Sequence, residues 1–244
     1  MNLLLLEPEE VIMGKVSLKG RRAKHLSDVL HVKPGDTVRA GLLNGPLGRA
    51  VVEKVHDGEV LLQCGFDDDS SPKPKVDLIL ALPRPKVLRR LWSSLAGLNV
   101  GHIALTNAWR VERNYFDTHL LKPEVFVPLL KEGLEQAGCT IMPTVSVHKR
   151  LVELIKRDLD EVFDIKTGPR ILAHPGAESS VSKILMASQP GRVLLAVGPE
   201  GGWIDRELEL FDREGFLSAK VGSSILRTDV ACHVLLGMIN ELRP

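Results

Sequence analysis

The chain has 244 residues, of which 44% are hydrophobic and 26% are charged, a composition typical of a folded globular protein. This length accommodates one large domain or two modest ones. The formal net charge is only +1, so any surface for nucleic acid must be a local patch. Cys64, Cys139 and Cys232 lie far apart and are odd in number, which fits neither a disulfide framework nor a CxxC metal site. We therefore expect a cytoplasmic protein without a metal.

The first quarter of the chain has the pattern of a small β-barrel. Residues 1–6 contain four consecutive leucines but no basic segment and no long apolar run, so we predict a first strand rather than a signal peptide or membrane span. Short β-rich runs, separated by the NGP and HDG turns of hairpins, follow at residues 36–43, 47–55 and 59–65. The polar run FDDDSSPKPK, residues 66–75, is predicted to be a linker, and residues 1–68 one domain.

Residues 75–244 alternate between strand and helix patterns and are predicted to form a second domain. Apolar strand candidates occur at residues 76–82, 102–107, 170–174 and 192–197. Helical patterns include PKVLRRLWSSLAGL, PEVFVPLLKEGLEQAG and a final DVACHVLLGMINEL, which Thr228 is predicted to cap. This alternation predicts an α/β fold with a largely parallel sheet, which binds ligands at the carboxyl ends of its strands.

Three loops at predicted strand ends hold the candidate binding residues: LAHPG (172–176), VGPEGG (197–202) and VGSSILRTDVA (221–231). Glycine permits positive φ angles and close approach of the backbone to a ligand, so VGPEGG indicates a binding loop. However, Glu200 within that loop would repel a phosphate. The sequence also contains no dinucleotide-binding, Walker or α/β-hydrolase motif and no histidine spacing typical of a metal site. We therefore predict a ligand without phosphate.

Two motifs near the C-terminus carry a resemblance to a known family. GPEGG, residues 198–202, is followed about twenty residues later by ILRTDVA, and an HP pair stands upstream. RRAKHLSDVLHVKPGD near the N-terminus and LEQAGCTIMP in mid-chain support these motifs. In these stretches the chain resembles the 16S ribosomal RNA uridine-N3 methyltransferase family of the SPOUT superfamily. The resemblance implies an N-terminal PUA-like barrel that binds RNA, a C-terminal trefoil-knotted methyltransferase domain, S-adenosyl-L-methionine as cofactor and a homodimer.

The resemblance implies that the three loops bind the cofactor. S-adenosyl-L-methionine has no phosphate, and its adenine and ribose can be read by backbone groups that glycine leaves accessible. For His174 we expect the backbone, rather than the imidazole, to face the cofactor. The residues expected at this site are Leu172, Ala173, His174, Pro175, Val197, Gly198, Gly201, Gly202, Ser224, Ile225, Leu226, Thr228 and Ala231.

Arg227 and Glu200 are the candidate catalytic residues. Uracil N3 carries a proton that must leave, and a cation near the uridinate oxygens stabilises the resulting anion, a role that suits Arg227 in the final loop. Its structural alternative is to tie the loop down through main-chain carbonyls. Glu200 is a candidate for handling the proton, and its structural alternative is to cap nearby amides.

Two basic regions are candidate contacts for ribosomal RNA or the small ribosomal subunit. Between residues 15 and 39, seven Lys or Arg stand against two Asp, a local excess suited to phosphates. In RPKVLRR (84–90) and WRVERNYF (109–116), cations alternate with aromatics that can stack on bases or fill a core or dimer seam. The predicted RNA-binding residues are Arg21, Arg22, Lys24, His25, Arg84, Arg110 and Arg113.

The sequence leaves alternatives open. It departs from the family pattern at Ser94, Gly97, Asn99, Cys139 and the Gly222-Ser223-Ser224 turn, positions suited to RNA or a dimer partner. A SPOUT methyltransferase acting on another rRNA or tRNA nucleotide is therefore one alternative. A non-catalytic PUA-like RNA-binding protein, which would need the barrel but not the three loops, is another. A nicotinamide oxidoreductase would need a pyrophosphate site, and the sequence offers none.

Overall fold

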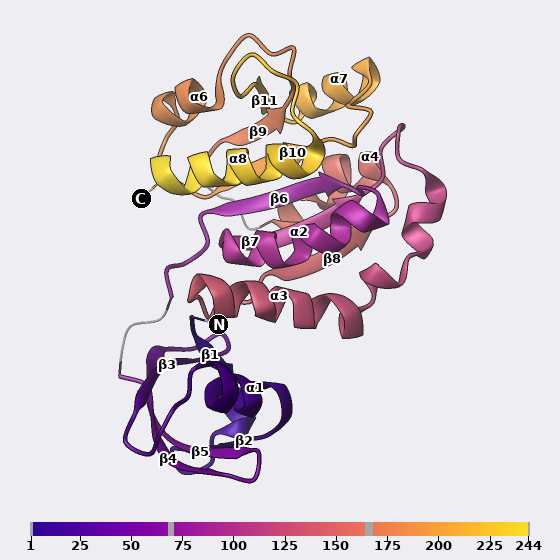
Figure 1. Cartoon of the computed structure of the whole chain (residues 1–244). Helices are drawn as coiled ribbons and strands as arrows, with labels where there is room; N and C mark the ends of the chain where they lie inside the picture. The colour runs from indigo at the N-terminus through magenta and orange to yellow at the C-terminus, as the bar shows by residue number, and fades with distance from the viewer. Residues whose placement is uncertain (1, 68–70, 164–167, 244) are drawn as a thin grey trace. The chain divides into compact units, whose positions relative to one another are not determined.

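The computed structural model describes residues 2–67, 71–163 and 168–243 (Figure 1). The chain divides into two compact units, Met1–Pro72 with Lys131–Met142, and Lys73–Leu130 with Pro143–Pro244. The predicted linker at 66–75 falls partly on residues 68–70, outside the described ranges. Ser71, the first described residue after this gap, is 3% exposed. The Ser71 hydroxyl accepts a hydrogen bond from the Thr140 N–H at 2.7 Å within the first unit. No helix in the described ranges is both long enough and apolar enough to cross a membrane.

The first unit is built on a curled five-stranded sheet. Its strands are β1 (Leu4–Leu6), β2 (Lys15–Leu18), β3 (Thr37–Leu42), β4 (Leu47–His56) and β5 (Glu59–Gly65), in the spatial order β1-β3-β4-β5-β2. β1 runs parallel to β3, and the other neighbouring pairs are antiparallel. A 3-10 turn (Pro8–Glu10), helix α1 (Gly20–Lys24) and a π-helical turn (His25–Val29) connect them. Alternate strand residues, such as Ala50 and Val52, face the buried core, as the period of two in a strand requires.

The second unit is built on a six-stranded sheet in which every neighbouring pair is parallel. The strands are β6 (Val76–Ala81), β7 (Val100–Thr106), β8 (Thr144–His148), β9 (Arg170–Ala173), β10 (Val193–Val197) and β11 (Phe216–Ala219), in the order β11-β9-β10-β6-β7-β8. All six carboxyl ends therefore lie along one edge. In open parallel sheets this edge is where ligands bind.

Helices and short turns connect these strands (Figure 1). The helices are α2 (Pro85–Gly97), α3 (Pro123–Ala137), α4 (Leu151–Glu153), α5 (Leu159–Val162), α6 (Val181–Ala187), α7 (Asp205–Arg213) and α8 (Thr228–Leu242). A π-helical turn (Leu154–Asp158) joins α4 to α5, and two 3-10 turns (Arg113–Asp117, His119–Leu121) precede α3. The last helix, α8, returns from the edge strand β11 to pack against β10, β6, α2 and α6.

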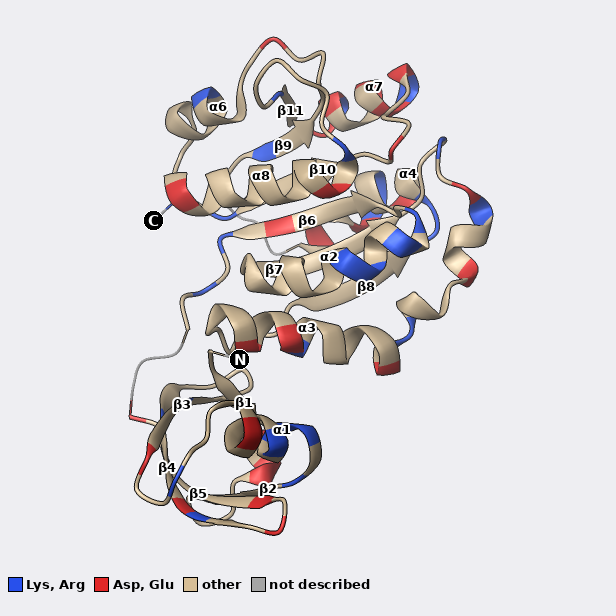
Figure 2. Cartoon of the chain, viewed as in Figure 1, with Lys and Arg blue, Asp and Glu red and all other residues tan. Residues whose placement is uncertain are grey.

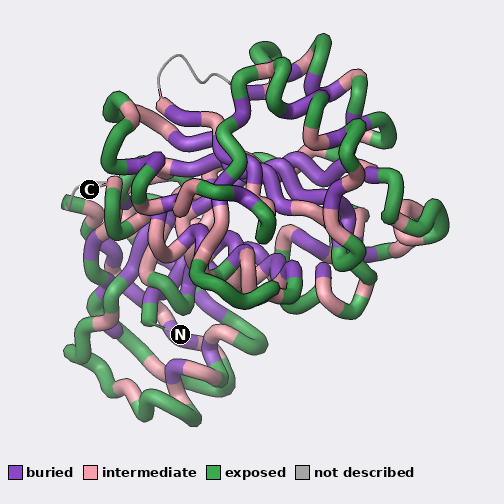
Figure 3. The backbone as a smooth tube through the Cα atoms, turned by 90° about the horizontal axis from the view of Figure 1, so that it is seen from above, coloured by how far each residue is buried: buried purple, intermediate pink, exposed green. Residues whose placement is uncertain are grey.

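The core of the second unit follows from its central strands. Every residue of β6 and β10 is buried, as expected for strands covered on both faces, and Figure 3 shows this buried interior in purple. Helix α2 is anchored by Trp92, whose indole N–H donates to the Leu120 carbonyl at 3.2 Å and whose ring lies 5.0 Å from that of Phe126. The Phe211 ring stands edge-on to both Trp203 and Phe216 beneath α7.

The predicted α/β organisation is confirmed at this level, with a curled sheet in one unit and a parallel sheet in the other. One feature was not predicted: Lys131–Met142, the end of α3 and the segment after it, belongs to the first unit. Within that unit the Asn2 and Leu3 N–H groups both donate to the Glu135 carbonyl at 3.0 Å. Partners so far apart along the chain leave no mark in a local sequence pattern.

Candidate active site

A cavity of about 390 Å³ opens at the carboxyl edge of the parallel sheet, beside β9, β10 and β11. Its size is within the range of small-molecule sites. The three predicted loops all contribute to its wall. The predicted cofactor residues that line it are Ala173, His174, Pro175, Val197, Gly198, Gly201, Gly202, Ser224, Ile225, Leu226, Thr228 and Ala231. Leu172 does not line it, because its side chain is fully buried in the core of the second unit.

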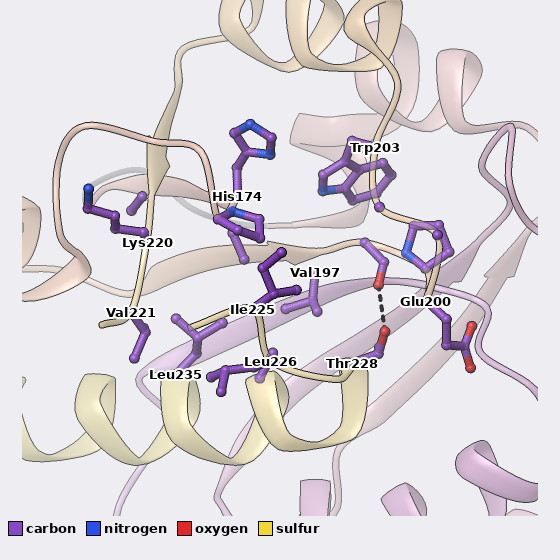
Figure 4. Close-up of a pocket in the computed structure, with 18 of the residues that line it drawn as sticks. His174, Val197, Glu200, Trp203, Lys220, Val221, Ile225, Leu226, Thr228 and Leu235 are labelled. Carbon is purple, nitrogen blue, oxygen red and sulfur yellow. Dashed lines mark hydrogen bonds between the residues drawn. The ribbon is translucent and has the colours of Figure 1, made fainter. Parts of the chain in front are cut away.

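Apolar side chains form much of the cavity wall (Figure 4). In this view the rings of His174 and Trp203 lie above, Leu226 and Leu235 lie below, and Ile225 lies between them. Sequence reasoning missed six lining residues: Pro199, Trp203, Ala219, Lys220, Val221 and Leu235. Pro199 and Val221 lie within the predicted loops, and Trp203, Ala219 and Lys220 lie just outside them. Leu235 lies one helical turn beyond Ala231, so helical spacing from Ala231 would have predicted it.

The GPEGG segment forms a tight turn in which the Gly202 N–H donates to the Pro199 carbonyl at 2.8 Å. Gly202 has a φ of +72°, which a side chain would strain. Gly201 is not in this left-handed region. A Cβ on Gly201 would instead lie 2.9 Å from the Arg110 side chain, and a Cβ on Gly198 would lie 3.0 Å from the Trp203 ring. A side chain at Gly198 or Gly201 would therefore be too close to a neighbouring side chain, and a side chain at Gly202 would be strained by the positive φ.

Arg110, which we predict to contact RNA, also lines this cavity. Its guanidinium donates a hydrogen bond to the Gly201 carbonyl. The guanidinium thus holds the GPEGG turn in place. The sequence could not reveal this contact, because the two residues are 91 positions apart.

The predicted cap of the last helix is corrected. Thr228 is the first residue of α8 and Arg227 is its N-cap, without a side-chain capping bond. The Thr228 hydroxyl donates to the Gly198 carbonyl at 3.3 Å, and its side chain is 5% exposed. Thr228 therefore joins the third loop to the GPEGG turn rather than capping the helix.

His174 makes two backbone hydrogen bonds within the protein. Its backbone N–H donates to the Ala219 carbonyl at 2.9 Å, and its carbonyl accepts from the Ala177 N–H at 3.1 Å. These bonds are used within the protein, whereas the side chain lies at the cavity (Figure 4). The backbone N–H of His174 therefore already has a protein partner, and the prediction that its backbone faces the cofactor stays a prediction.

One polar group at the cavity has no protein partner. Among the described residues, nothing accepts a hydrogen bond from the buried indole N–H of Trp203. Buried donors are almost always paired in native proteins, so this N–H suits a ligand acceptor. Lys220 adds a cation to the wall, which suits an anionic ligand group such as a carboxylate. Burial raises the pKa of the nearby Cys232 thiol to about 12, so it stays protonated and is not a nucleophile.

Arg227 lines a second, smaller cavity beside the first. The two share Glu200, Ile225, Leu226 and Thr228. Arg84 and Arg90 line the second cavity as well, so three arginines contribute to its wall. The Arg227 side chain is 79% exposed, and its Nε is 3.7 Å from the Asp229 carboxylate, which also accepts from Arg90 at 3.1 Å.

In the first unit, several cations of the predicted RNA-binding region are already paired. Arg22 donates to Glu10 and to the Leu5 carbonyl, and its side chain is only 27% exposed. Glu10 raises the pKa of Arg22, and Arg22 lowers that of Glu10. Arg22 is therefore held by Glu10 and Leu5, and a contact with phosphate would compete with this ion pair. Arg21 lies 3.6 Å from both Glu132 and Glu135, so it too is partly neutralised.

The other predicted RNA-binding residues differ in accessibility. Lys24, Arg84 and Arg113 are exposed, as phosphate contacts require. His25 is half-buried, and within the described residues its Nε2 has no hydrogen-bond partner. No cluster of three or more His, Cys, Asp or Glu suitable for a metal occurs in the described part of the chain.

Comparison with known proteins identifies the family. The family model described as an RNA methyltransferase domain matches residues 70–240. The chain belongs to this family. A relative of this RNA methyltransferase is the ribosomal RNA small subunit methyltransferase E of Treponema pallidum, 31% identical over 97% of this chain and 91% of that protein. The ribosomal RNA small subunit methyltransferase E 1 of Borreliella burgdorferi is 28% identical over 95% of this chain and 94% of its own.

Solved structures share the fold of this RNA methyltransferase at low sequence identity. A ribosomal RNA small subunit methyltransferase E from Neisseria gonorrhoeae bound to S-adenosyl methionine aligns with a TM-score of 0.75 at 21% identity, covering 99% of this chain and 98% of that one. A probable rRNA-methyltransferase from Porphyromonas gingivalis aligns with a TM-score of 0.76 at 20% identity, covering 100% and 98%. The family resemblance predicted from GPEGG and ILRTDVA is confirmed.

Proposed function

We propose that this chain transfers a methyl group from S-adenosyl-L-methionine to N3 of a uridine in 16S ribosomal RNA. The observation that carries the proposal is the convergence of three loops on one cavity at the carboxyl edge of the sheet. Relatives over nearly the whole chain are named ribosomal RNA small subunit methyltransferase E, and a protein of the same fold binds S-adenosyl methionine. Uridine N3 as the target rests on the resemblance of the GPEGG and ILRTDVA motifs.

The cavity has the donor set that this cofactor needs. Val197, Leu226 and Leu235 supply an apolar wall for the adenine, and the Trp203 indole N–H supplies a free donor. Lys220 suits the carboxylate of the methionine moiety. When bound, the cofactor supplies an electrophilic methyl group on a sulfonium centre. The residues of the cavity orient it and exclude water, and positioning of this kind can supply a large share of the rate enhancement.

Arg227 stabilises the negative charge that forms on the uracil when N3 loses its proton. Three arginines, Arg84, Arg90 and Arg227, line the cavity beside the cofactor site together with the carboxylates of Glu200 and Asp229. This lining has a small excess of positive charge, which favours an anion. Glu200 shares both cavities, but its carboxylate is hydrogen-bonded to the start of α2. We assign Glu200 a positioning role, so the N3 proton passes to water or to an RNA group.

Finer features of the fold belong to the same proposal. The curled sheet of the first unit corresponds to a PUA-like barrel that contacts RNA. The return of α8 from the edge of the sheet to its centre is consistent with a trefoil knot closed by residues 222–228. Val230, Val234 and Met238 form a half-buried apolar stripe on α8, which suits the seam of a homodimer. Sedimentation at micromolar concentration tests that assembly. A cytoplasmic location, expected from the free cysteines, is part of the same proposal.

Nucleoside mass spectrometry of ribosomal RNA tests the function. RNA from cells with the gene should contain N3-methyluridine in its 16S fraction, and RNA from cells without it should lack that nucleoside. Reintroducing the gene should restore the signal. A different methylated nucleoside that follows the gene would point to another target of the same enzyme. Unchanged RNA together with no calorimetric binding of S-adenosyl-L-methionine would favour a non-catalytic RNA-binding protein.

A further inference from the structure

A large basic groove lies at the carboxyl ends of β7 and β8, outside the site described above. It encloses about 1220 Å³ and is formed by the segments after these two strands and by the start of α7. Six cationic side chains line it: Arg113, Lys149, Arg150, Lys156, Arg157 and Arg206. We call this surface the basic groove. All of it belongs to the second unit.

The groove has a net positive charge in a chain that is almost neutral overall. Its six cations face only three acidic lining residues, Asp117, Glu153 and Glu207. Glu207 is 8% exposed, and its carboxylate accepts from the Trp109 N–H at 2.8 Å and the Ile204 N–H at 3.0 Å. Glu153 is paired with Arg150. The remaining cations give the groove a positive potential. Figure 2 shows Lys and Arg residues as blue segments near α4.

Trp109 gives the groove an aromatic surface. Trp109 is 78% exposed, an unusual state for the largest apolar residue. The hydrogen bond from the Trp109 backbone N–H to the Glu207 carboxylate fixes the backbone from which the indole projects. An exposed ring beside cations is the arrangement that stacks on unpaired bases while neighbouring side chains neutralise phosphates. A duplex keeps its bases stacked inside, so this arrangement favours a single strand.

The groove lies next to the proposed cofactor cavity. Trp109 lines the groove and Arg110 lines the cavity, while Trp203 lines the cavity and Ile204 the groove. The Trp109-Arg110 and Trp203-Ile204 pairs therefore stand between the groove and the cavity, along the carboxyl edge of one sheet. A strand lying in the groove would lead toward the site of methyl transfer.

We propose that the basic groove binds a single-stranded segment of RNA next to the target nucleotide, with phosphates on its Lys and Arg residues and a base on Trp109. The proposal rests on the proposed function for the nature of the substrate. It adds a substrate-binding surface in the second unit that is separate from the barrel. Phosphate contacts supply affinity, and stacking at Trp109 selects unpaired RNA.

Fluorescence anisotropy with a labelled twelve-nucleotide oligouridine tests the groove directly. The full-length K156A/R157A variant should bind at least about 10-fold more weakly than the wild type, and the slope of log affinity against log salt should shrink by about one per cation removed. W109A should weaken binding of the single strand by about 10-fold, and W109F should retain most of it. K183A removes an exposed cation on α6, away from the groove, and is the matched control.

Further measurements separate this proposal from its alternatives. Emission from the exposed Trp109 should be quenched by oligouridine and not by polyglutamate, and W109F should abolish the quenching. Equal binding of polyglutamate, or groove variants that bind oligouridine like the wild type, would overturn the groove as an RNA site. Calorimetry with S-adenosyl-L-methionine is run on the same samples. Wild-type protein that binds RNA through the groove but no cofactor would contradict the proposed function and leave the groove standing.

Discussion

The carboxylate of Glu200 accepts a hydrogen bond from the backbone N–H of Arg84 at 3.1 Å. Arg84 is the N-cap of α2, so this bond ties the GPEGG turn, which follows β10, to the start of the helix that follows the neighbouring strand β6. The N–H groups at a helix start lack partners within the helix, and a carboxylate also interacts favourably with the helix dipole there. In Figure 4 the Glu200 carboxylate points away from the apolar residues of the cavity.

This contact predicts that Glu200 acts through structure rather than through proton transfer. E200Q keeps an acceptor oxygen and should retain the methylation rate within about 3-fold, whereas E200A should lower stability by about 1 kcal/mol through the lost hydrogen bond. Thermal unfolding and single-turnover methylation measure the two effects. A loss of rate of about 100-fold in E200Q, with stability unchanged, would instead make Glu200 the proton acceptor.

The glycines of the GPEGG turn allow a second prediction. G202V forces a β-branched residue to a φ of +72° at the cavity wall and should abolish binding of S-adenosyl-L-methionine. G215V, between α7 and β11, imposes similar strain at a φ of +77° away from the cavity, so it should lose comparable stability and still bind. Calorimetry on both variants, after their folding is checked by circular dichroism, distinguishes the loop assignment from general destabilisation. Equal affinities would remove the turn from the binding site.

The central strands could be predicted from the sequence because burial on both faces requires continuous apolar runs. β6 and β10 are such strands, and both were predicted within one residue at each end. The edge strands β8 and β11 were not predicted. They are short and partly exposed, with Leu217 of β11 49% exposed, so no apolar run marks them. Their positions are fixed by pairing with β7 and β9.

The loops of the site could be predicted, whereas the contacts among distant residues could not. Gly198 and Gly202 stand in a motif that can be seen in the sequence. The bonds from Arg110 to Gly201 and from Thr228 to Gly198 join residues 91 and 30 positions apart. The acids that face Arg21 come from positions more than 100 residues away, so counting charges between residues 15 and 39 overestimated the free positive charge.

The pairing of Arg22 predicts that two neighbouring cations behave differently. R22A leaves the half-buried Glu10 carboxylate without its main partner and should destabilise the first unit by about 1–3 kcal/mol. K24A removes an exposed cation and should leave stability unchanged while reducing the slope of log RNA affinity against log salt by about one. Urea unfolding and a salt titration of RNA binding test the pair. An R22A protein as stable as the wild type, with weaker RNA binding, would restore Arg22 to the RNA-contacting set.

His102 predicts how stability responds to acid. Burial lowers the pKa of its imidazole to about 4, and the positive charges of His148 and Arg192 act in the same direction. The folded chain therefore keeps the ring neutral at pH values where the unfolded chain, with a pKa of about 6.5, binds a proton. The contribution of neutral His102 to the free energy of unfolding is therefore fully present above about pH 6.5 and is lost as pH falls toward 4. The urea midpoint should fall less between pH 7 and pH 5 in H102Q than in the wild type. A difference equal to that of the wild type would contradict this assignment.

Arg227 allows the most direct test of the chemistry. If its guanidinium stabilises the uridinate, it acts chiefly in the transition state, so R227A should lower the saturated single-turnover rate by about 100-fold or more while RNA and cofactor affinities stay nearly the same. R227K keeps the charge without the planar guanidinium and should recover part of the rate. K24A is the matched comparison, because a cation that only positions RNA should raise the apparent dissociation constant and leave the saturated rate unchanged. A normal saturated rate in R227A would assign Arg227 to RNA positioning, leaving Arg84 and Arg90 at the same cavity as the candidates for stabilising the anion.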